Sequence, residues 1–132
     1  MLNKEVPSIE LCKALEGLGW EREGLYWWNP TYDSLNQPED YVLELEPFDG
    51  DALIAPTVVE MLEVLPERVL RSRISYYLLI EKSNGWFIKY RDTMPDGLSW
   101  IIVDESLPNA LARMIIYLEK EGHIKLGVKG EI

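Results

Sequence analysis

Between residues 74 and 103 the chain reads ISYYLLIEKSNGWFIKYRDTMPDGLSWIIV. Apolar side chains alternate with other residues on both sides of Asn84-Gly85, which is the period of a β-strand. Asn84 and Gly85 both tolerate a positive φ, so the pair indicates a tight turn between two strands. Pro95-Asp96-Gly97 indicates a second turn, and Leu98–Val103 follows as a third strand. The stretch therefore predicts a meander of three antiparallel strands.

Three helices are expected outside the meander, and each has a recognisable start. The first begins near Ser8, whose hydroxyl can cap an unpaired backbone amide. The second follows Thr57, which stands three residues before Glu60 in the spacing of a capping box. The last begins at Ser106 or Pro108, carries a wide apolar stripe and ends at Gly122.

The region between the first two helices is expected to be less regular. Leu25–Trp28 is rich in aromatic residues and predicts a short strand that ends at Asn29-Pro30. Thr31–Asp40 is polar and rich in turn residues, so we expect a loop there. Tyr41–Glu46 alternates weakly and is a possible further strand.

This order of elements predicts an α+β fold. We expect an antiparallel sheet of three to five strands that ends in the three-strand meander, with about three helices packed on one face. A length of 132 residues suits one domain that covers 1–132, with 125–132 as a frayed tail.

Charge is distributed unevenly along the chain. The formal net charge is −10, and residues 1–66 hold 14 acidic and 3 basic side chains while residues 67–132 hold 9 and 10. The acidic half repels phosphate backbones and attracts cationic surfaces. General nucleic-acid binding is therefore not expected, whereas a partner protein with a basic surface is.

The sequence also restricts the cellular compartment. Cys12 is the single cysteine, so no disulfide can form within the chain. The N-terminus lacks the apolar segment of a secretory signal, and no apolar run reaches the roughly 18 residues that a membrane span requires. We expect a cytoplasmic protein that does not associate with a membrane.

No catalytic signature is present. His123 is the single histidine and follows the last helix, where the helix dipole favours a positive charge. Cys12 lies on the apolar face of the first helix and reads as a small core residue. There is no Gly-x-Ser-x-Gly elbow, P-loop or dinucleotide fingerprint. No catalytic residue, cofactor or metal ligand is assigned, and the choice between an enzyme and a binding protein leans toward the latter.

Aromatic and acidic residues gather between positions 27 and 51. Trp27 and Trp28 are adjacent, so a regular strand cannot turn both toward the core, and an exposed tryptophan is a strong anchor for a partner. The acidic residues fit neither an EF-hand loop nor a metallohydrolase pattern. The predicted partner-binding residues are Trp27, Trp28, Tyr32, Tyr41, Glu44, Glu46, Asp49 and Asp51.

Six segments of the chain form a further pattern, Ser8–Leu15, Tyr26–Trp28, Ala55–Thr57, Leu62–Pro66, Asn109–Ala112 and Leu118–Gly122. Together they resemble a family of small proteins of unassigned function that phages and prophages of bacteria encode. They consist of helix caps and core positions, and the family offers no catalytic residues to transfer. The resemblance implies a mobile-element origin and a location in the bacterial cytoplasm or in the host cell of a phage.

Three functions remain open from the sequence. The first is a phage-type accessory protein that binds a host protein without catalysis. A special case is an inhibitor whose carboxylates imitate DNA phosphates. The second is a small enzyme or ligand-binding domain, in which Trp27, Trp28 and Tyr41 stack a flat ligand and Glu44 or Glu46 transfers a proton. The third is a homo-oligomeric structural component that associates through apolar strand faces.

Overall fold

The computed structural model describes residues 6–20, 24–32, 38–47, 52–71, 73–92 and 99–126. Most of the expected tail at 125–132 and the turn at Pro95-Asp96-Gly97 lie outside these ranges. The described residues form three helices and seven strands. In chain order these are α1 (Ile9–Gly17), β1 (Tyr26–Tyr32), β2 (Pro38–Glu44), β3 (Leu53–Ala55), α2 (Val58–Val64), β4 (Arg68–Arg71), β5 (Ile74–Lys82), β6 (Trp86–Arg91), β7 (Ser99–Asp104) and α3 (Leu107–Lys120).

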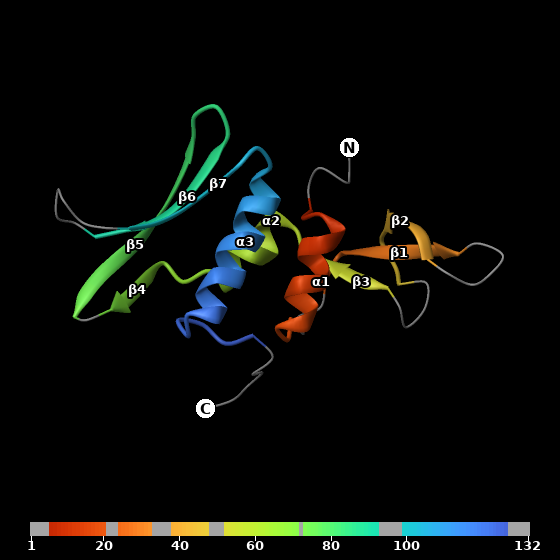
Figure 1. Ribbon diagram of the computed structural model, residues 1–132, viewed down its shortest axis with the longest axis horizontal. Coiled ribbons are helices and arrows are strands. Elements are labelled where there is room, and N and C mark those ends of the chain that lie inside the picture. Colours follow the sequence, from red (N-terminus) through yellow and green to blue (C-terminus); the bar gives the residue numbers. More distant parts are fainter. Residues whose placement is uncertain are drawn as a thin grey trace.

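The elements form layers along the long axis of the molecule. Figure 1 shows the four-stranded sheet β4-β5-β6-β7 at one end, the helices in the middle and the three-stranded sheet β2-β1-β3 at the other end. Helix α3 contacts β6 and β7, whereas α1 contacts β3 and α3. Each sheet thus has helices on one face, and the α+β class is confirmed, with the strands shared between two antiparallel sheets.

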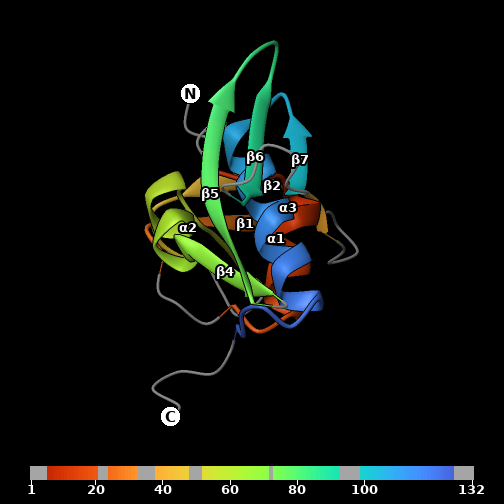
Figure 2. The same cartoon turned by 90° about the vertical axis from the view of Figure 1, so that its left-hand side faces the viewer.

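The meander is formed as the sequence predicts. Strand β5 pairs with β6, and β6 pairs with β7, both in antiparallel register. Asn84 and Gly85 have φ values of 53° and 130° in the turn between β5 and β6. Figure 2 shows β5, β6 and β7 on the near side of the molecule, with the helices behind them.

The helices begin at the predicted cap residues. Ser8 accepts a hydrogen bond from the amide of Leu11, and Ser106 accepts one from the amide of Asn109. Thr57 and Glu60 form the complete capping box at the start of α2. Gly122, with a φ of 83°, follows α3. No helix in the described ranges has the length and apolar character needed to cross a membrane.

Two hydrophobic cores lie between the layers. In the larger one α3 buries Leu111, Ile115 and Leu118 against Ile88 and Tyr90 of β6, and none of these side chains is exposed to solvent. The smaller core lies between α1 and the three-stranded sheet, and its buried members are Val6, Cys12, Trp28, Leu53 and Ala55. Helix α1 contributes Leu15 to the first core and Cys12 to the second, so it joins them.

The prediction for residues 29–40 is wrong in two respects. Strand β1 continues through Asn29-Pro30 to Tyr32, and β2 already begins at Pro38, so both strands extend into the expected loop. Asn29 donates hydrogen bonds to the Glu44 carboxylate and the Glu46 carbonyl, which holds the two strands together. On its β3 side, β1 pairs only through Tyr26–Trp28. Pro30 lies beyond this pairing, so its missing N–H breaks no hydrogen bond between β1 and β3.

Candidate functional site

The structure divides the predicted partner-binding residues between the two faces of the three-stranded sheet. Trp28 and Tyr41 lie on the inner face in the smaller core, where Trp28 is buried and its indole N–H donates to the Pro7 carbonyl at 3.2 Å. Trp27 lies on the opposite face, half-buried, and pairs across the strands with Glu44. The alternation expected for the two tryptophans is therefore present.

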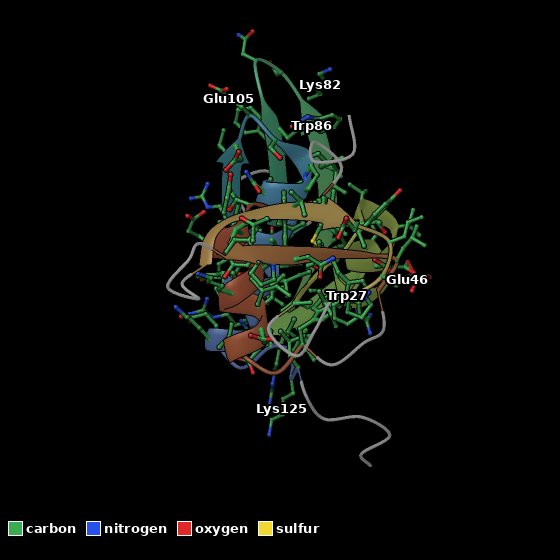
Figure 3. All side chains as sticks on the ribbon, turned by 90° about the vertical axis from the view of Figure 1, so that its right-hand side faces the viewer. Trp27, Glu46, Lys82, Trp86, Glu105 and Lys125 are labelled. Carbon is green, nitrogen blue, oxygen red and sulfur yellow. The ribbon has the colours of Figure 1, made fainter. Side chains whose placement is uncertain are left out.

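The acidic residues do not surround the inner aromatic side chains. Glu44 and Glu46 are exposed, and Glu44 accepts the hydrogen bond from Asn29. Figure 3 shows Trp27 and Glu46 at the three-stranded sheet. The side chain of Tyr32 and the whole of Asp49 and Asp51 lie outside the described residues. Trp27, Glu44 and Glu46 are therefore neighbours, whereas the expected stack of Trp27, Trp28 and Tyr41 around one ligand is not formed.

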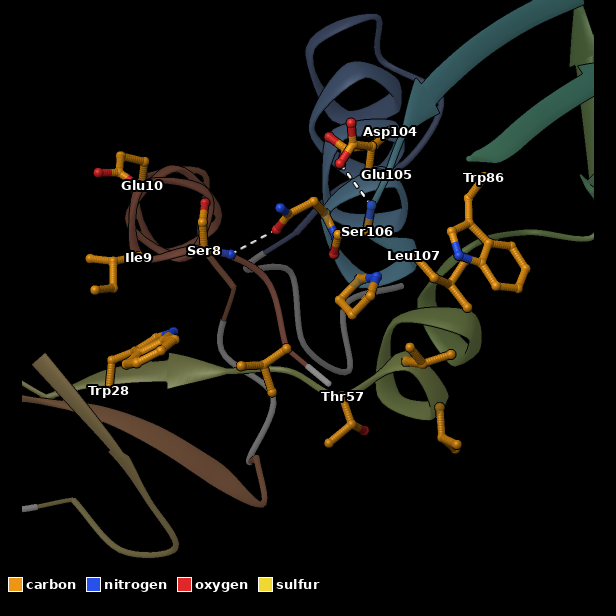
Figure 4. Close-up of a pocket in the computed structure, with 15 residues that line it drawn as sticks. Ser8, Ile9, Glu10, Trp28, Thr57, Trp86, Asp104, Glu105, Ser106 and Leu107 are labelled. Atoms are coloured by element: carbon orange, nitrogen blue, oxygen red, sulfur yellow. Dashed lines mark hydrogen bonds between the residues drawn. The ribbon is translucent and has the colours of Figure 1, made fainter. Parts of the chain in front are cut away.

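A pocket of about 1050 Å³ lies where the three helices begin. We call it the interhelix pocket. Its lining includes the cap residues Ser8, Thr57 and Ser106, so one end of every described helix faces it (Figure 4). The helix starts were predicted individually from local signals, but their convergence depends on tertiary packing.

The walls of the interhelix pocket are apolar. Trp28 comes from the three-stranded sheet and Trp86 from the four-stranded sheet, so residues of both sheets border the pocket. Ile9, Val58 and Leu107 complete the apolar wall. Lys82 places its ammonium 5.4 Å from the centroid of the Trp86 ring. The alternating sequence places Trp86 on a strand, whereas its place in a pocket depends on the helix starts that pack beside it.

The rim of the interhelix pocket is acidic. The carboxylates of Glu10, Asp104 and Glu105 line it, and no lysine, arginine or histidine is among the lining residues that the structure describes. Glu10 and Glu105 are exposed. Asp104 accepts hydrogen bonds from the Ser106 amide at 2.9 Å and from Arg113 at 3.3 Å. The pocket thus presents negative charge to solvent.

Side-chain caps satisfy part of the unpaired amides at the three helix starts. The hydroxyls of Ser8, Thr57 and Ser106 each accept a hydrogen bond from an amide in the first turn of their own helix. The amide of Ser8 itself donates to the Asn109 side-chain oxygen at 2.8 Å, which links α1 to α3. These internal caps occupy the named amides, and the walls and the rim supply the other groups of the pocket considered below.

The single cysteine and the single histidine both lie beside aromatic side chains. Burial raises the pKa of the Cys12 thiol to about 12, although a hydrogen bond involving Trp28 opposes the shift, so the thiol stays protonated at neutral pH. His123 packs edge-on against Trp100, with ring centroids 5.1 Å apart. Across the described ranges, no three His, Cys, Asp or Glu side chains are grouped closely enough to hold a metal ion.

Comparisons with known proteins leave the family open. Neither the models of protein families, nor the curated proteins, nor the solved structures gave a match to this chain. The resemblance to phage and prophage proteins therefore stays a prediction, and the function has to be argued from the geometry of the interhelix pocket and the two sheets.

Proposed function

We propose that this protein binds a partner protein without catalysing a reaction, and that the interhelix pocket accepts a basic segment of that partner. One observation carries the proposal: two tryptophans line an open pocket whose described lining includes three carboxylates and no basic residue, although Arg113 pairs with one of these carboxylates, Asp104. A partner of this chemistry agrees with the net charge of −10. The resemblance to phage and prophage proteins supports a role as an accessory factor or an inhibitor of a host protein.

Long basic side chains fit both parts of the pocket. The aliphatic stem of a lysine or arginine buries its surface against apolar walls while its charged head remains at the solvent. Trp28 and Trp86 offer such walls, and the carboxylates of Glu10 and Glu105 stand where the head would emerge. Tryptophan faces also attract cations directly, as the position of Lys82 on Trp86 illustrates. Complementary charge additionally speeds association.

Binding is favoured over catalysis because the polar groups at the pocket have structural tasks. The hydroxyls of Ser8, Thr57 and Ser106 serve as helix caps. Asp104 holds the start of α3 and accepts from Arg113. Neither histidine, a common general base, nor cysteine, a common nucleophile, is among the described lining residues.

Synthetic peptides test the proposal directly. A labelled peptide of about ten alternating leucine and lysine residues is compared with a leucine–glutamate peptide of the same length, by fluorescence anisotropy. The basic peptide is expected to bind, and its affinity should fall as salt rises because salt screens exposed charges. Equal binding of the acidic peptide would overturn the proposal.

Matched variants locate the site. The double substitution E10Q/E105Q removes the two exposed rim charges and should weaken the basic peptide roughly fivefold, as expected for the loss of two exposed ion pairs. The control E16Q/E121Q removes two exposed charges at the other ends of α1 and α3. Its net charge is the same as that of E10Q/E105Q. If both double variants lose the same affinity, the attraction is general and the pocket is not the site.

A small organic amine is a second candidate ligand, because the volume of about 1050 Å³ lies at the upper end of the range for small-molecule sites. A long-chain alkylamine and the matching alcohol distinguish the two cases. Tight binding of the amine together with no binding of either peptide would favour the ligand-binding alternative. Displacement of a bound basic peptide by excess amine would place both in the interhelix pocket.

A further inference from the structure

In the part of the chain that the structure describes, one face of the four-stranded sheet is uncovered by helices. Along β6, Ile88 and Tyr90 are fully buried toward α3, so Phe87, Lys89 and Arg91 point the opposite way. We call this opposite side the outer face, and it faces the viewer in Figure 2. Its large and well exposed apolar side chains are Leu70 (64%), Tyr77 (42%), Leu79 (40%), Ile101 (51%) and Val103 (46%). An apolar surface of this extent is typical of a protein interface.

The outer face carries more cations than anions. Arg68, Lys89 and Arg91 project from it, whereas Glu81 is the one carboxylate that its described strands place there. Glu81 accepts the Lys89 ammonium at 2.7 Å. This hydrogen bond and the charge of Lys89 lower the pKa of Glu81, and Arg91 adds to the shift. Glu81 is thus balanced within its own face, while no ion pair among the described residues engages Arg68 or Arg91.

One row across the sheet sets the spacing of the two arginines. Arg68 on β4 pairs with Tyr77 on β5, and Tyr77 pairs with Arg91 on β6. Neighbouring strands lie about 4.8 Å apart, so the backbones of the two arginines are about 10 Å apart with Tyr77 between them. An α-helix with its side chains has a diameter of about 10 Å. A helix that lies over β5 would therefore have one guanidinium along each of its sides.

Apolar side chains continue along β5 from this row. Leu79 follows Tyr77 by two residues, so it lies about 7 Å further along the outer face. Ile101 belongs to the same row as Leu79, on the far side of Lys89. A hollow of about 460 Å³ adjoins the arginine row, and it is lined by Glu67, Arg68, Tyr77 and Leu78. The outer face thus has an apolar floor along β5 with cations on both flanks.

We propose that the outer face binds an acidic amphipathic helix of a partner protein, which lies over β5. The apolar stripe of this helix packs on Tyr77 and Leu79, and carboxylates at its two borders meet Arg68 and Arg91. Arginine and carboxylate groups often pair through two parallel hydrogen bonds, which adds geometric specificity. The inner face of the same sheet shows this type of packing, because α3 lays its apolar stripe on β6 and β7 there.

The negative net charge of the chain lies away from the outer face. All four strands of this sheet come from residues 68–104, and residues 67–132 hold 9 acidic and 10 basic side chains. The acidic excess belongs to residues 1–66, which supply the three-stranded sheet at the opposite end of the molecule (Figure 1). An acidic partner therefore meets local positive charge at the outer face.

Aliphatic side chains favour a protein over a nucleic acid as the occupant. Single-stranded nucleic acids stack successive bases on aromatic rings along a cationic groove. On the outer face Tyr77 and Phe87 stand four residues apart along the strands, because Phe87 pairs with Glu81. Leu79 and Ile101 occupy the row between them. The apolar stripe of a helix matches such a floor better than a run of bases does.

The outer face and the interhelix pocket lie on different sides of the sheet. Trp86, which lines the pocket, packs with the larger core on the helix side of β6. The inference therefore goes beyond the proposed function and can fail independently of it. The alternating leucine–glutamate peptide does not fit the outer face, since its extended form turns every carboxylate away from the surface that its leucines touch.

A synthetic helical peptide tests the proposal by fluorescence anisotropy. The acidic peptide has about sixteen residues, with leucines at helical spacing, glutamates at both borders of the leucine stripe and alanines elsewhere. The control peptide carries glutamine in place of every glutamate. The acidic peptide should bind roughly fivefold more tightly than the control, as expected for two exposed ion pairs.

Matched protein variants locate the contact. R68Q/R91Q removes both guanidiniums and should bind the two peptides almost equally, because the glutamates lose their partners. The control K120Q/K125Q removes two exposed cations at the C-terminal end of α3 and beyond it, and has the same net charge as R68Q/R91Q. It should keep the preference for the acidic peptide. L79S should weaken both peptides, since it removes part of the apolar floor. Circular dichroism confirms that each variant is folded.

Several results would overturn the proposal. These are equal binding of the two helical peptides by the unmodified protein, and a preference for the acidic peptide that survives R68Q/R91Q. Tighter binding of a thymidine oligonucleotide of about ten residues would also overturn it and make the outer face a nucleic-acid site. E10Q/E105Q should keep its affinity for the acidic helix, and R68Q/R91Q should keep its affinity for the leucine–lysine peptide. Failure at one surface is thereby distinguished from failure at the other.

Discussion

At the scale of the residue, Cys12 shows how burial controls chemistry. Its thiol is 1% exposed in the smaller core, and burial raises its pKa from 9.0 to about 12. The unfolded chain therefore loses the proton near pH 9 while the folded chain keeps it. A folded state that binds more protons than the unfolded state loses stability as pH rises. We expect the free energy of unfolding to fall between pH 9 and about 12, by up to about 1.4 kcal/mol per pH unit.

The contribution of Cys12 is measured against C12A. That variant removes a buried sulfur and should lower stability at pH 7 by about 1 kcal/mol. It should also show a shallower decline above pH 9 in urea titrations, because the alanine has no proton to lose. Parallel declines of the two proteins would contradict the assignment. The folded protein should also resist thiol-reactive dyes until denaturant exposes the thiol.

At the scale of the element, α2 depends strongly on its start. The helix has only 7 residues, and short helices gain little from their own hydrogen bonds. Thr57 accepts from the Glu60 amide while the Glu60 carboxylate accepts from the Thr57 amide. T57A should lower the free energy of unfolding by about 1 kcal/mol, whereas T57S keeps the hydroxyl and should retain most of the stability. Chemical denaturation measures both, and equal losses would show that the methyl group matters rather than the cap.

Elements of this kind could be predicted from sequence because their signals are local. The caps at Ser8, Thr57 and Ser106 and the turn at Asn84-Gly85 each depend on a few adjacent residues. Strands β3 and β4 have only 3 and 4 residues, too few to show a period, and their existence depends on partners elsewhere in the chain. The extension of β1 through Pro30 likewise depends on a neighbour, because β3 pairs with β1 only as far as Trp28 and leaves Pro30 unpaired on that side.

At the scale of the whole molecule, the site is harder to predict than the elements. Trp28 is one of the predicted partner-binding residues, but its neighbours at the interhelix pocket come from four other segments of the chain. Glu10 and Glu105 lie 95 positions apart in the sequence, and only the packing of α1 beside α3 brings them to one rim. The acidic residues of 39–51, which stand out in the sequence, lie instead along β2 and beyond it.

The contact between α1 and α3 includes one hydrogen bond that can be removed by itself. The Ser8 amide donates to the Asn109 side-chain oxygen between the two helices, in a partly buried position. N109A leaves that amide without an acceptor, which costs about 1–3 kcal/mol, whereas N109D keeps an oxygen at the same place. Hydrogen exchange should quicken in α1 and in the strands β1 and β3 while β6 and β7 change little, because the larger core does not depend on this bond. Trp28 would then move relative to Trp86, so the basic peptide should bind N109A more weakly than N109D. Uniform quickening in all strands would instead mean that the two cores unfold as one unit and that the pocket cannot open by itself.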